Sequence, residues 1–327
     1  MHEWAFEQRL CARLESRGAL VARQLGAGVA APGNRVVDAL VVETGPGFEA
    51  RAALTDAAIP GPVLDADLGA GRARYWKDAV RGLDVHPDRA RGAVDRAVEV
   101  GALEAERRNG RLYVRRAARY PGDWFAGLTA VENKPDLGRP GELEVQLRTD
   151  VSLALVDRVV LATASHVTRA HLNRLPDPVG VWRFLTDTGQ VEVVREAEQL
   201  PVDEPGIELL ERRPGRDVVE VVGPDAKTRA RRRLAERAYG KGWRPSGHAG
   251  CANARVESID GVAGLTGCGR YDRLVDPATD CGEGCSAYEP ADPPSYDRAT
   301  LRDRTSPWVV DPAGRARRQG SLDAFGG

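Results

Sequence analysis

The sequence predicts an α/β fold, and three stretches carry that prediction. Residues 3–17 repeat apolar side chains at helical spacing, which is typical of an amphipathic helix. Residues 35–43, RVVDALVVE, are rich in β-branched residues and predict a strand. A short apolar run at 128–131 predicts a second strand, followed by a helical stretch at 142–156 and a further strand at 157–164. Helices alternating with short apolar strands favour a sheet covered by helices.

The first helix and the first of these strands each bring an acidic side chain to an apolar surface. The helix places four apolar residues on one face: Phe6, Leu10, Cys11 and Leu14. Cys11 is therefore expected to be a buried apolar residue, and Glu7 borders the same face. Asp38 lies in the middle of the apolar strand, where a carboxylate is costly to bury without a cation or a hydrogen-bond partner.

Glu132 and Lys134 follow the second strand, separated by one residue. Residues i and i+2 of a strand point to the same face, so both side chains project together from its end. A carboxylate and an ammonium held there can bind a divalent metal and orient a water. Lys134 is one of four lysines among 47 basic residues, and arginine cannot replace a compact ammonium beside a nucleophilic water. The plain alternative is an exposed salt bridge.

The order of these elements resembles the core of the PD-(D/E)XK nuclease superfamily. In the helix after Lys134, Gln146 and Asp150 lie one turn apart, and a helical piece at 168–174 and a strand pair at 180–196 follow. The resemblance implies a restriction-endonuclease-like core over 1–65 and 119–200, although Val37 replaces the proline usual before the aspartate. It implies that Asp38 and Glu132 bind Mg²⁺ or Mn²⁺, with Glu7 completing the site. Lys134 would orient water, and Gln146 would contact substrate or metal.

Composition sets bounds on these expectations. The net charge of −1 does not by itself indicate a nucleic-acid partner, so only local patches of basic residues can indicate one. No run approaches the roughly 20 apolar residues of a membrane span. The N-terminus lacks an apolar signal segment. We expect a soluble, cytoplasmic protein without membrane contact. The chain also resembles an uncharacterised family from halophilic archaea, which implies no function.

Residues 66–118 predict a winged helix inserted between the two nuclease-like segments. Residues 44–71, rich in Gly, Pro and Ala, predict a connection. Residues 72–83 predict a helix, and Pro87 begins a second one that ends before Gly101. Asn109-Gly110 predicts a tight hairpin. Residues 87–119 contain nine arginines against five acidic residues. The expected DNA contacts are Arg89, Arg91, Arg107, Arg108, Arg111 and Arg115. A packing or protein-binding domain with a solvated hairpin is the alternative.

The remaining chain predicts three further segments. Residues 201–245 predict a linker, in which 202–216 is rich in Pro and acidic residues and uninformative, and then a basic helix from Pro224 that either is solvated or borders a DNA groove. Residues 246–290 predict a four-cysteine metal module, and 291–327 a flexible tail in which Trp308 is the large apolar residue that can dock. The module's cysteines are Cys251, Cys268, Cys281 and Cys285.

Four thiolates suit tetrahedral Zn²⁺ or an iron–sulfur cluster, and both stay open. Two disulfides are the alternative for a secreted protein, and nothing in the sequence indicates export. His248, three residues before Cys251, is a possible replacement for one sulfur and is otherwise a surface residue. The segment has few large apolar residues, so a metal would supply its folding energy.

The chain ends in a pattern that resembles a clamp-binding peptide, or PIP box. Gln319, Leu322 and Phe325 have the spacing Q-x-x-L-x-x-F. The resemblance implies recruitment to a DNA sliding clamp, although Gly326 stands where a second aromatic is usual. A chance pattern in a disordered end is the alternative.

Together these features predict a metal-dependent DNA phosphodiesterase in repair, replication or restriction. The rival interpretation is a non-catalytic DNA-binding adaptor or a transcription regulator that uses the winged helix.

Overall fold

The computed structural model describes residues 2–31, 33–138 and 141–312, and its mixed helices and strands confirm the α/β class. The helices are α1 (Glu3–Glu15), α2 (Phe48–Ala52), α3 (Gly61–Asp65), α4 (Trp76–Ala79), α5 (Pro87–Glu99), α6 (Leu143–Leu153), α7 (Arg169–Leu172), α8 (Pro224–Lys241) and α9 (Arg298–Thr305). The strands are β1 (Leu20–Gly26), β2 (Val36–Thr44), β3 (Arg74–Tyr75), β4 (Leu103–Arg108), β5 (Arg111–Arg116), β6 (Phe125–Asn133), β7 (Arg158–Thr163), β8 (Gly180–Leu185), β9 (Gln190–Arg195), β10 (Gly206–Arg213), β11 (Arg216–Val222), β12 (Ala254–Ile259), β13 (Val262–Cys268) and β14 (Arg273–Leu274).

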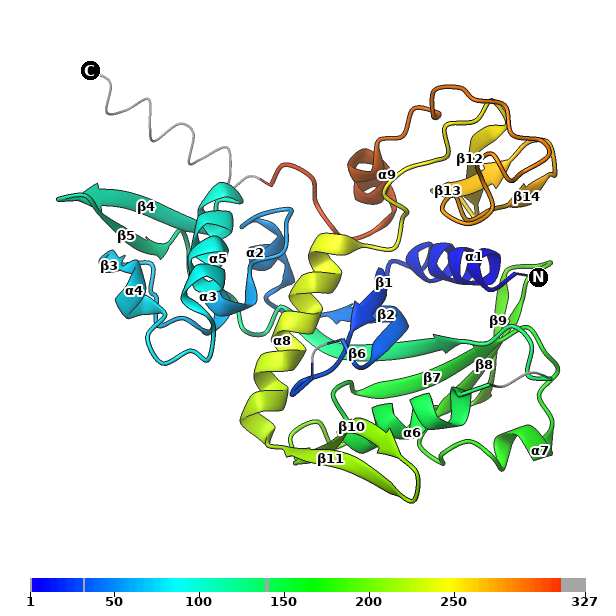
Figure 1. Ribbon diagram of the computed structural model, residues 1–327, viewed down its shortest axis with the longest axis horizontal. Coiled ribbons are helices and arrows are strands. Elements are labelled where there is room, and N and C mark those ends of the chain that lie inside the picture. Colours follow the sequence, from blue (N-terminus) through cyan, green and yellow to red (C-terminus); the bar gives the residue numbers. More distant parts are fainter. Residues whose placement is uncertain (1, 32, 139–140, 313–327) are drawn as a thin grey trace.

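A six-stranded sheet in the order β1-β2-β6-β7-β8-β9 forms the centre of the molecule (Figure 1). The first three strands run antiparallel, β6, β7 and β8 run parallel, and β9 is antiparallel to β8. Helix α6 provides the crossover that the parallel pair of β6 and β7 requires. Within this six-stranded sheet, every strand except β1 was predicted, with ends that differ by one or a few residues.

Helices cover both faces of this sheet. Helix α1 packs on one face together with β13, and Phe6, Leu10 and Cys11 are fully buried there, as predicted. Helices α6 and α8 pack on the other face, where Leu147 and Tyr239 are fully buried. The apolar stripe of each helix is buried against the sheet, and this burial stabilises the helix. The helices in turn shield the two apolar faces of the sheet from water, which the sheet cannot do alone.

The chain leaves the sheet after β2 and returns at β6, and the residues between build a separate small core. Here β3, β5 and β4 form a three-stranded sheet against α3, α4 and α5, at the opposite end of the molecule from β9 (Figure 1). The predicted hairpin is present, with Asn109 and Gly110 at φ of 50° and 75°. Gly101, at φ 74°, ends α5 as predicted.

Two expectations for this region were wrong. Residues 44–71 are not a plain connection, because they contain α2 and α3 and bury Val63 and Leu64 against α5. These helices have five residues each, too short to show a helical period. The predicted helix over 72–83 is reduced to α4, because Arg74 and Tyr75 pair with β5 as a short strand.

Residues 202–216, which the sequence left uninformative, contain β10 and lead directly into β11 of a hairpin. Glu208 of β10 is 2% exposed. Its carboxylate accepts backbone N–H bonds from Val29, Ala30 and Ala31, at 2.7 to 3.2 Å. The hairpin thereby holds the loop that follows β1, a contact between distant segments that local sequence does not encode.

Helix α8 crosses the molecule between the small core and the central sheet (Figure 1). A buried ion pair joins α8 to α2: both nitrogens of the Arg51 fork lie 2.6 Å from Glu236 oxygens. Glu236 also accepts from the Tyr120 hydroxyl at 2.8 Å and from the Ile59 N–H at 3.1 Å. This set of bonds connects the insertion to the central sheet through one side chain of α8.

The C-terminal part contains the sheet β12-β13-β14 and helix α9, and it packs beside α1. Trp308 docks as expected: it is 6% exposed, and its indole N–H donates to the Asp56 carbonyl at 2.8 Å. Gln319, Leu322 and Phe325 lie outside the described residues. Among the helices that the structure describes, none combines the length and the apolar character needed to span a bilayer.

Candidate functional site

Asp38 and Glu132 lie at neighbouring ends of two paired strands. Strands β2 and β6 run antiparallel with Ala39 opposite Val131, and continuing this register places Asp38 opposite Glu132. The Asn133 backbone N–H donates to Asp38 Oδ2 at 2.9 Å, which holds the Asp38 carboxylate across the end of β6. Residues far apart in the sequence are thus brought together by strand pairing, and the sequence analysis expected this pair.

Gln24 joins Asp38 to Glu7 on α1. Its side-chain Nε2 lies 3.3 Å from Glu7 Oε2 and 3.3 Å from Asp38 Oδ1. Gln24 has a φ of 52°, and it interrupts the β1–β2 pairing between Arg23 and Leu25. The register is the same on both sides of Gln24, so Gln24 stands opposite Asp38, and its amide reaches both carboxylates. Arg23 forms an ion pair with Glu7, and its guanidinium stacks 4.0 Å from the Trp4 ring centroid.

Arg35 holds Glu132 from the other side. Arg35 NH2 lies 2.6 Å from Glu132 Oε2 and 2.7 Å from Asp150 Oδ2, and its Nε lies 2.8 Å from Asp150 Oδ1. Asp150 is on α6, one turn beyond Gln146. A single guanidinium therefore fixes a carboxylate of β6 against one of α6 with charge-assisted bonds.

Glu132, Glu7 and Asp150 of this cluster resist ionisation. Burial raises the pKa of Glu132 to about 7; the negative charge of Asp38 adds to the increase, and Arg35 opposes it. Burial also raises the pKa values of Glu7 and Asp150, again with a contribution from Asp38. Asp38 thus adds to the increase in all three pKa values, after the larger effect of burial. A bound divalent cation would stabilise the ionised forms that burial disfavours.

Lys134 and Gln146 form no side-chain hydrogen bond with the cluster in the described part of the chain. The Lys134 backbone N–H donates to the Ala162 carbonyl at 2.9 Å, which ties the end of β6 to β7. Its half-buried side chain has no ion pair within the described part of the chain. The Gln146 side chain is half-buried and likewise has no hydrogen bond to the described carboxylates. The ammonium of Lys134 is therefore free to contact a ligand.

The arginines expected to contact DNA fall into two groups. Three have nearby carboxylate partners: Arg91 with Asp95, Arg108 with Glu106, and Arg115 with Glu104. The other three are exposed and have no ion pair in the described residues: Arg89, Arg107 and Arg111. The positive charges of this second group are more available to phosphates, because the carboxylate partners of the first group partly offset the charges of its arginines.

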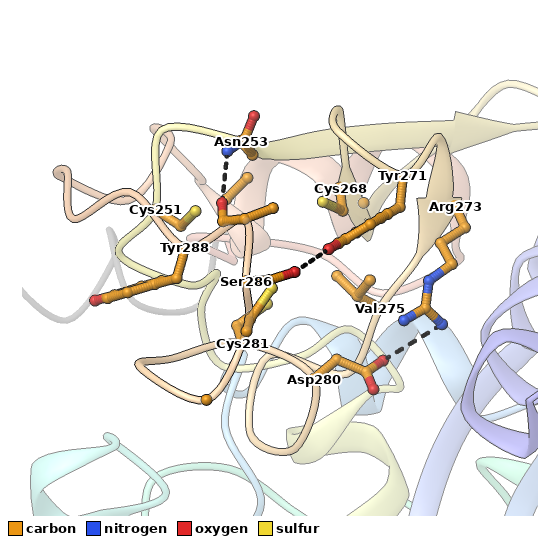
Figure 2. A pocket seen from close by; sticks show the side chains of 15 residues that line it. Cys251, Asn253, Cys268, Tyr271, Arg273, Val275, Asp280, Cys281, Ser286 and Tyr288 are labelled. Atoms are coloured by element: carbon orange, nitrogen blue, oxygen red, sulfur yellow. Dashed lines mark hydrogen bonds and ion pairs between the residues drawn. The ribbon is translucent and has the colours of Figure 1, made fainter.

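The four cysteines Cys251, Cys268, Cys281 and Cys285 line one cavity of about 290 Å³. Figure 2 shows Cys251, Cys268 and Cys281 on different sides of it. All four are free thiols. Burial raises the pKa of Cys281, and the charges of the other three thiols add to the increase. The side chains thus lie near enough to affect one another.

The thiols do not have the geometry of a closed coordination shell. Within residues 2–31, 33–138 and 141–312, no group of three or more His, Cys, Asp or Glu side chains has the placement that holds a metal ion. His248 does not line the cavity; its ring packs against Tyr296, with centroids 4.6 Å apart. Backbone hydrogen bonds from Glu289 and Asn253 lower the pKa of Cys251, which favours its thiolate.

Three polar residues of the carboxylate cluster were not predicted as site residues. Gln24 is in a strand that the sequence analysis did not identify, and Arg35 stands at the beginning of β2 among many other arginines. Asp150 carried a usable signal, because it is an acidic residue one helical turn from Leu147 and Leu153, on a face that packs on the sheet.

The described residues define a mixed α/β protein with a buried carboxylate cluster at the end of its central sheet. A family model matches residues 20–290, and the chain therefore belongs to DUF5787, a family of unknown function. The match includes Asp38, Glu132, Lys134 and the four cysteines, but it begins after α1 and Glu7. Searches of curated proteins and of solved structures found no match.

Proposed function

We propose that this protein is a metal-dependent DNA phosphodiesterase with a core that resembles PD-(D/E)XK nucleases. The adjacency of Asp38 and Glu132 at the paired ends of β2 and β6 is the observation that carries the proposal. Lys134 follows Glu132 by two residues, directly after β6. The order α1, β1, β2, β6, α6, β7 supports it, since this unit places the strands with Asp38 and Glu132 side by side.

The side chains present fit a hard divalent cation. Carboxylate oxygens are the ligands that Mg²⁺ and Mn²⁺ prefer. Asp38 and Glu132 would hold the ion, with Glu7 beside them through Gln24. Arg35 donates a hydrogen bond to Glu132 Oε2, whereas Glu132 Oε1 accepts no hydrogen bond from the described residues. Bound there, Mg²⁺ would supply positive charge to a scissile phosphate.

Lys134 would orient the attacking water. Its ammonium is a compact donor without a carboxylate partner among the described residues, so it can hold a water or a phosphate oxygen. Gln24 keeps Asp38 and Glu7 oriented toward each other, and Arg35 keeps Glu132 against α6. These two residues position the ligands and do not react.

The insertion would bind duplex DNA as a winged helix. The sheet order β3-β5-β4 behind α4 and α5 supports this proposal, because the hairpin then extends beyond the small core as a wing. Arg107 and Arg111 of that hairpin and Arg89 of α5 are the exposed cations available to phosphates. Their contribution to affinity would fall with salt.

The four-cysteine module would hold Zn²⁺ or an iron–sulfur cluster in a structural position. Four soft donors around one cavity fit either group. Since the thiols are not gathered into a coordination shell, binding would require the loop with Cys281 and Cys285 to close on β13. The C-terminal Gln319, Leu322 and Phe325 would recruit the enzyme to a sliding clamp.

Cleavage assays test the catalytic proposal. Purified protein is incubated with branched, single-stranded and double-stranded DNA, with and without Mg²⁺ or Mn²⁺. Lys134→Ala and Glu132→Ala should each abolish metal-dependent cleavage while DNA affinity stays within about tenfold, or 1.4 kcal/mol. Glu49→Ala, on the exposed side of α2, is the matched control and should cleave normally.

Undiminished cleavage by the Lys134→Ala or Glu132→Ala protein would remove the assigned site. Metal-independent DNA binding without cleavage by the wild type would favour the adaptor instead.

A further inference from the structure

A basic groove runs along α8 and ends at Gln24, which bonds to the carboxylate cluster. Two adjoining cavities form it, of about 510 and 380 Å³, and they share Ala58 and Arg237 in their walls. Gln24 lines the first cavity, and α3 with the segment before it lines the second. One wall of the whole groove is therefore α8, and the other sides come from residues before β3, from Arg96 of α5 and from Leu155.

Three cations of α8 line this groove at intervals of four residues: Arg233, Arg237 and Lys241. Residues four apart lie on one helix face, so their side chains follow one another along the groove. Arg233 forms an ion pair with Asp65. Arg237 donates to the Gly26 carbonyl, and Lys241 Nζ donates to the Gln24 carbonyl at 2.6 Å.

The charges of Arg237 and Lys241 are not neutralised by an ion pair. Both side chains bond to backbone carbonyls, and the described residues offer neither one a carboxylate in ion-pair contact. Burial lowers the pKa of Arg237, and the nearby charge of Arg233 lowers it further. Burial lowers the pKa of Lys241 too; Arg23 and Arg237 add to the decrease, and the charge of Glu7 opposes it. A bound anion would relieve this repulsion.

The groove leads to the catalytic carboxylates through a single residue. Gln24, whose carbonyl accepts from Lys241, donates through its side chain to both Glu7 and Asp38. At the other wall, Arg96 of α5 lines the same cavity, so the inserted unit and the sheet share it. A ligand in the groove would contact both units and Gln24, whose side chain donates to Asp38.

We infer that this groove binds the phosphodiester backbone of one DNA strand, with Arg237 and Lys241 contacting phosphates next to the one that is cleaved. The inference rests on the proposed function, because it assigns the path of the substrate into that site. A polyanion is favoured over a small anion because the two cavities adjoin and the cations extend along a row.

Salt-dependent DNA binding of charge variants tests the inference. Fluorescence anisotropy with labelled 20-nucleotide single-stranded and duplex DNA, in EDTA, measures affinity without cleavage. The double variant Arg237→Gln/Lys241→Gln should reduce the slope of log K against log salt by about 1.5 to 2. At 0.1 M salt each lost duplex contact should weaken binding roughly eightfold. Arg237→Lys, which keeps the charge, should restore most of the slope lost with Arg237→Gln.

The matched control is Arg212→Gln/Arg216→Gln on the β10–β11 hairpin, which removes the same charge from residues that line neither cavity. The inference is overturned if the groove variant keeps the wild-type slope, if the control loses as much, or if wild-type protein binds neither DNA. Its failure is distinguishable from failure of the catalytic proposal. If the wild type cleaves DNA but the Arg237→Gln/Lys241→Gln variant keeps the wild-type salt slope, only the groove inference is refuted. If that variant has a reduced salt slope but the wild type does not cleave DNA, only the nuclease proposal is refuted.

Discussion

The buried carboxylate of Glu132 provides a quantitative test of the site. Its side chain is 5% exposed, and its pKa is raised from 4.5 to about 7. The folded protein therefore binds this proton more tightly than the unfolded chain does. By linkage, the free energy of unfolding should fall as pH rises from about 4.5 to about 7 and level off above that range. A shift of this size is worth about 3 kcal/mol, at 1.36 kcal/mol for each pKa unit.

Glu132→Gln removes the ionisation while keeping the shape of the side chain. Arg35 still has Asp150 as a bidentate partner, so the substitution does not leave the guanidinium unpaired. The variant should match wild type near pH 4.5 and exceed it at pH 8 by up to about 3 kcal/mol, while losing metal-dependent cleavage. Its greater stability would show that the wild type retains an unfavourable buried charge at this position.

Chemical unfolding in urea at pH 4.5, 6, 7 and 8 measures the difference. Glu49→Gln, an exposed carboxylate on α2, is the control and should show no comparable gain at pH 8. Adding Mg²⁺ at pH 8 should stabilise wild type and leave Glu132→Gln unchanged, because the ion needs the carboxylate. The reasoning fails if Glu132→Gln is no more stable than wild type at pH 8, or if its advantage does not depend on pH.

Three further outcomes are expected. Purified protein should contain about one equivalent of zinc or a brown iron–sulfur chromophore, and Cys285→Ser should lower the metal content; metal-free, folded protein with four free thiols would contradict the module. Glu236→Ala should destabilise the protein by about 3–5 kcal/mol in thermal or urea unfolding, because it leaves buried Arg51 unpaired; a loss under 1 kcal/mol would show that the pair is replaceable. A peptide of the last dozen residues should bind the organism's sliding clamp at about micromolar affinity. Phe325→Ala should weaken this binding by about 2 kcal/mol or more, and equal affinities of the two peptides would contradict recruitment to the clamp.

The sequence by itself determined most of the regular elements, because their signals are local. The apolar faces of α1 and α5 repeat at helical spacing, and Asn109-Gly110 has the backbone freedom that a two-residue hairpin turn needs. The same local logic identified Asp38 and Glu132, since a carboxylate in or at the end of an apolar strand is conspicuous. Helices α2 and α3 are too short to show a helical repeat of apolar residues, so the prediction of a plain connection over residues 44–71 was wrong.

Only the tertiary structure decided which polar residues meet. Arg35 is one arginine among many in the sequence, and its importance follows from lying within 2.7 Å of carboxylates on both β6 and α6. Gln24 joins α1 to β2 because a left-handed residue interrupts the strand pairing at that point. The α8 cations form a groove wall because the helix crosses between two units far apart in the chain. Strand register, helix docking and burial act over long sequence separations. These long-range effects therefore determine which polar side chains are in contact, and what charge and pKa each has, and no local sequence pattern encodes them.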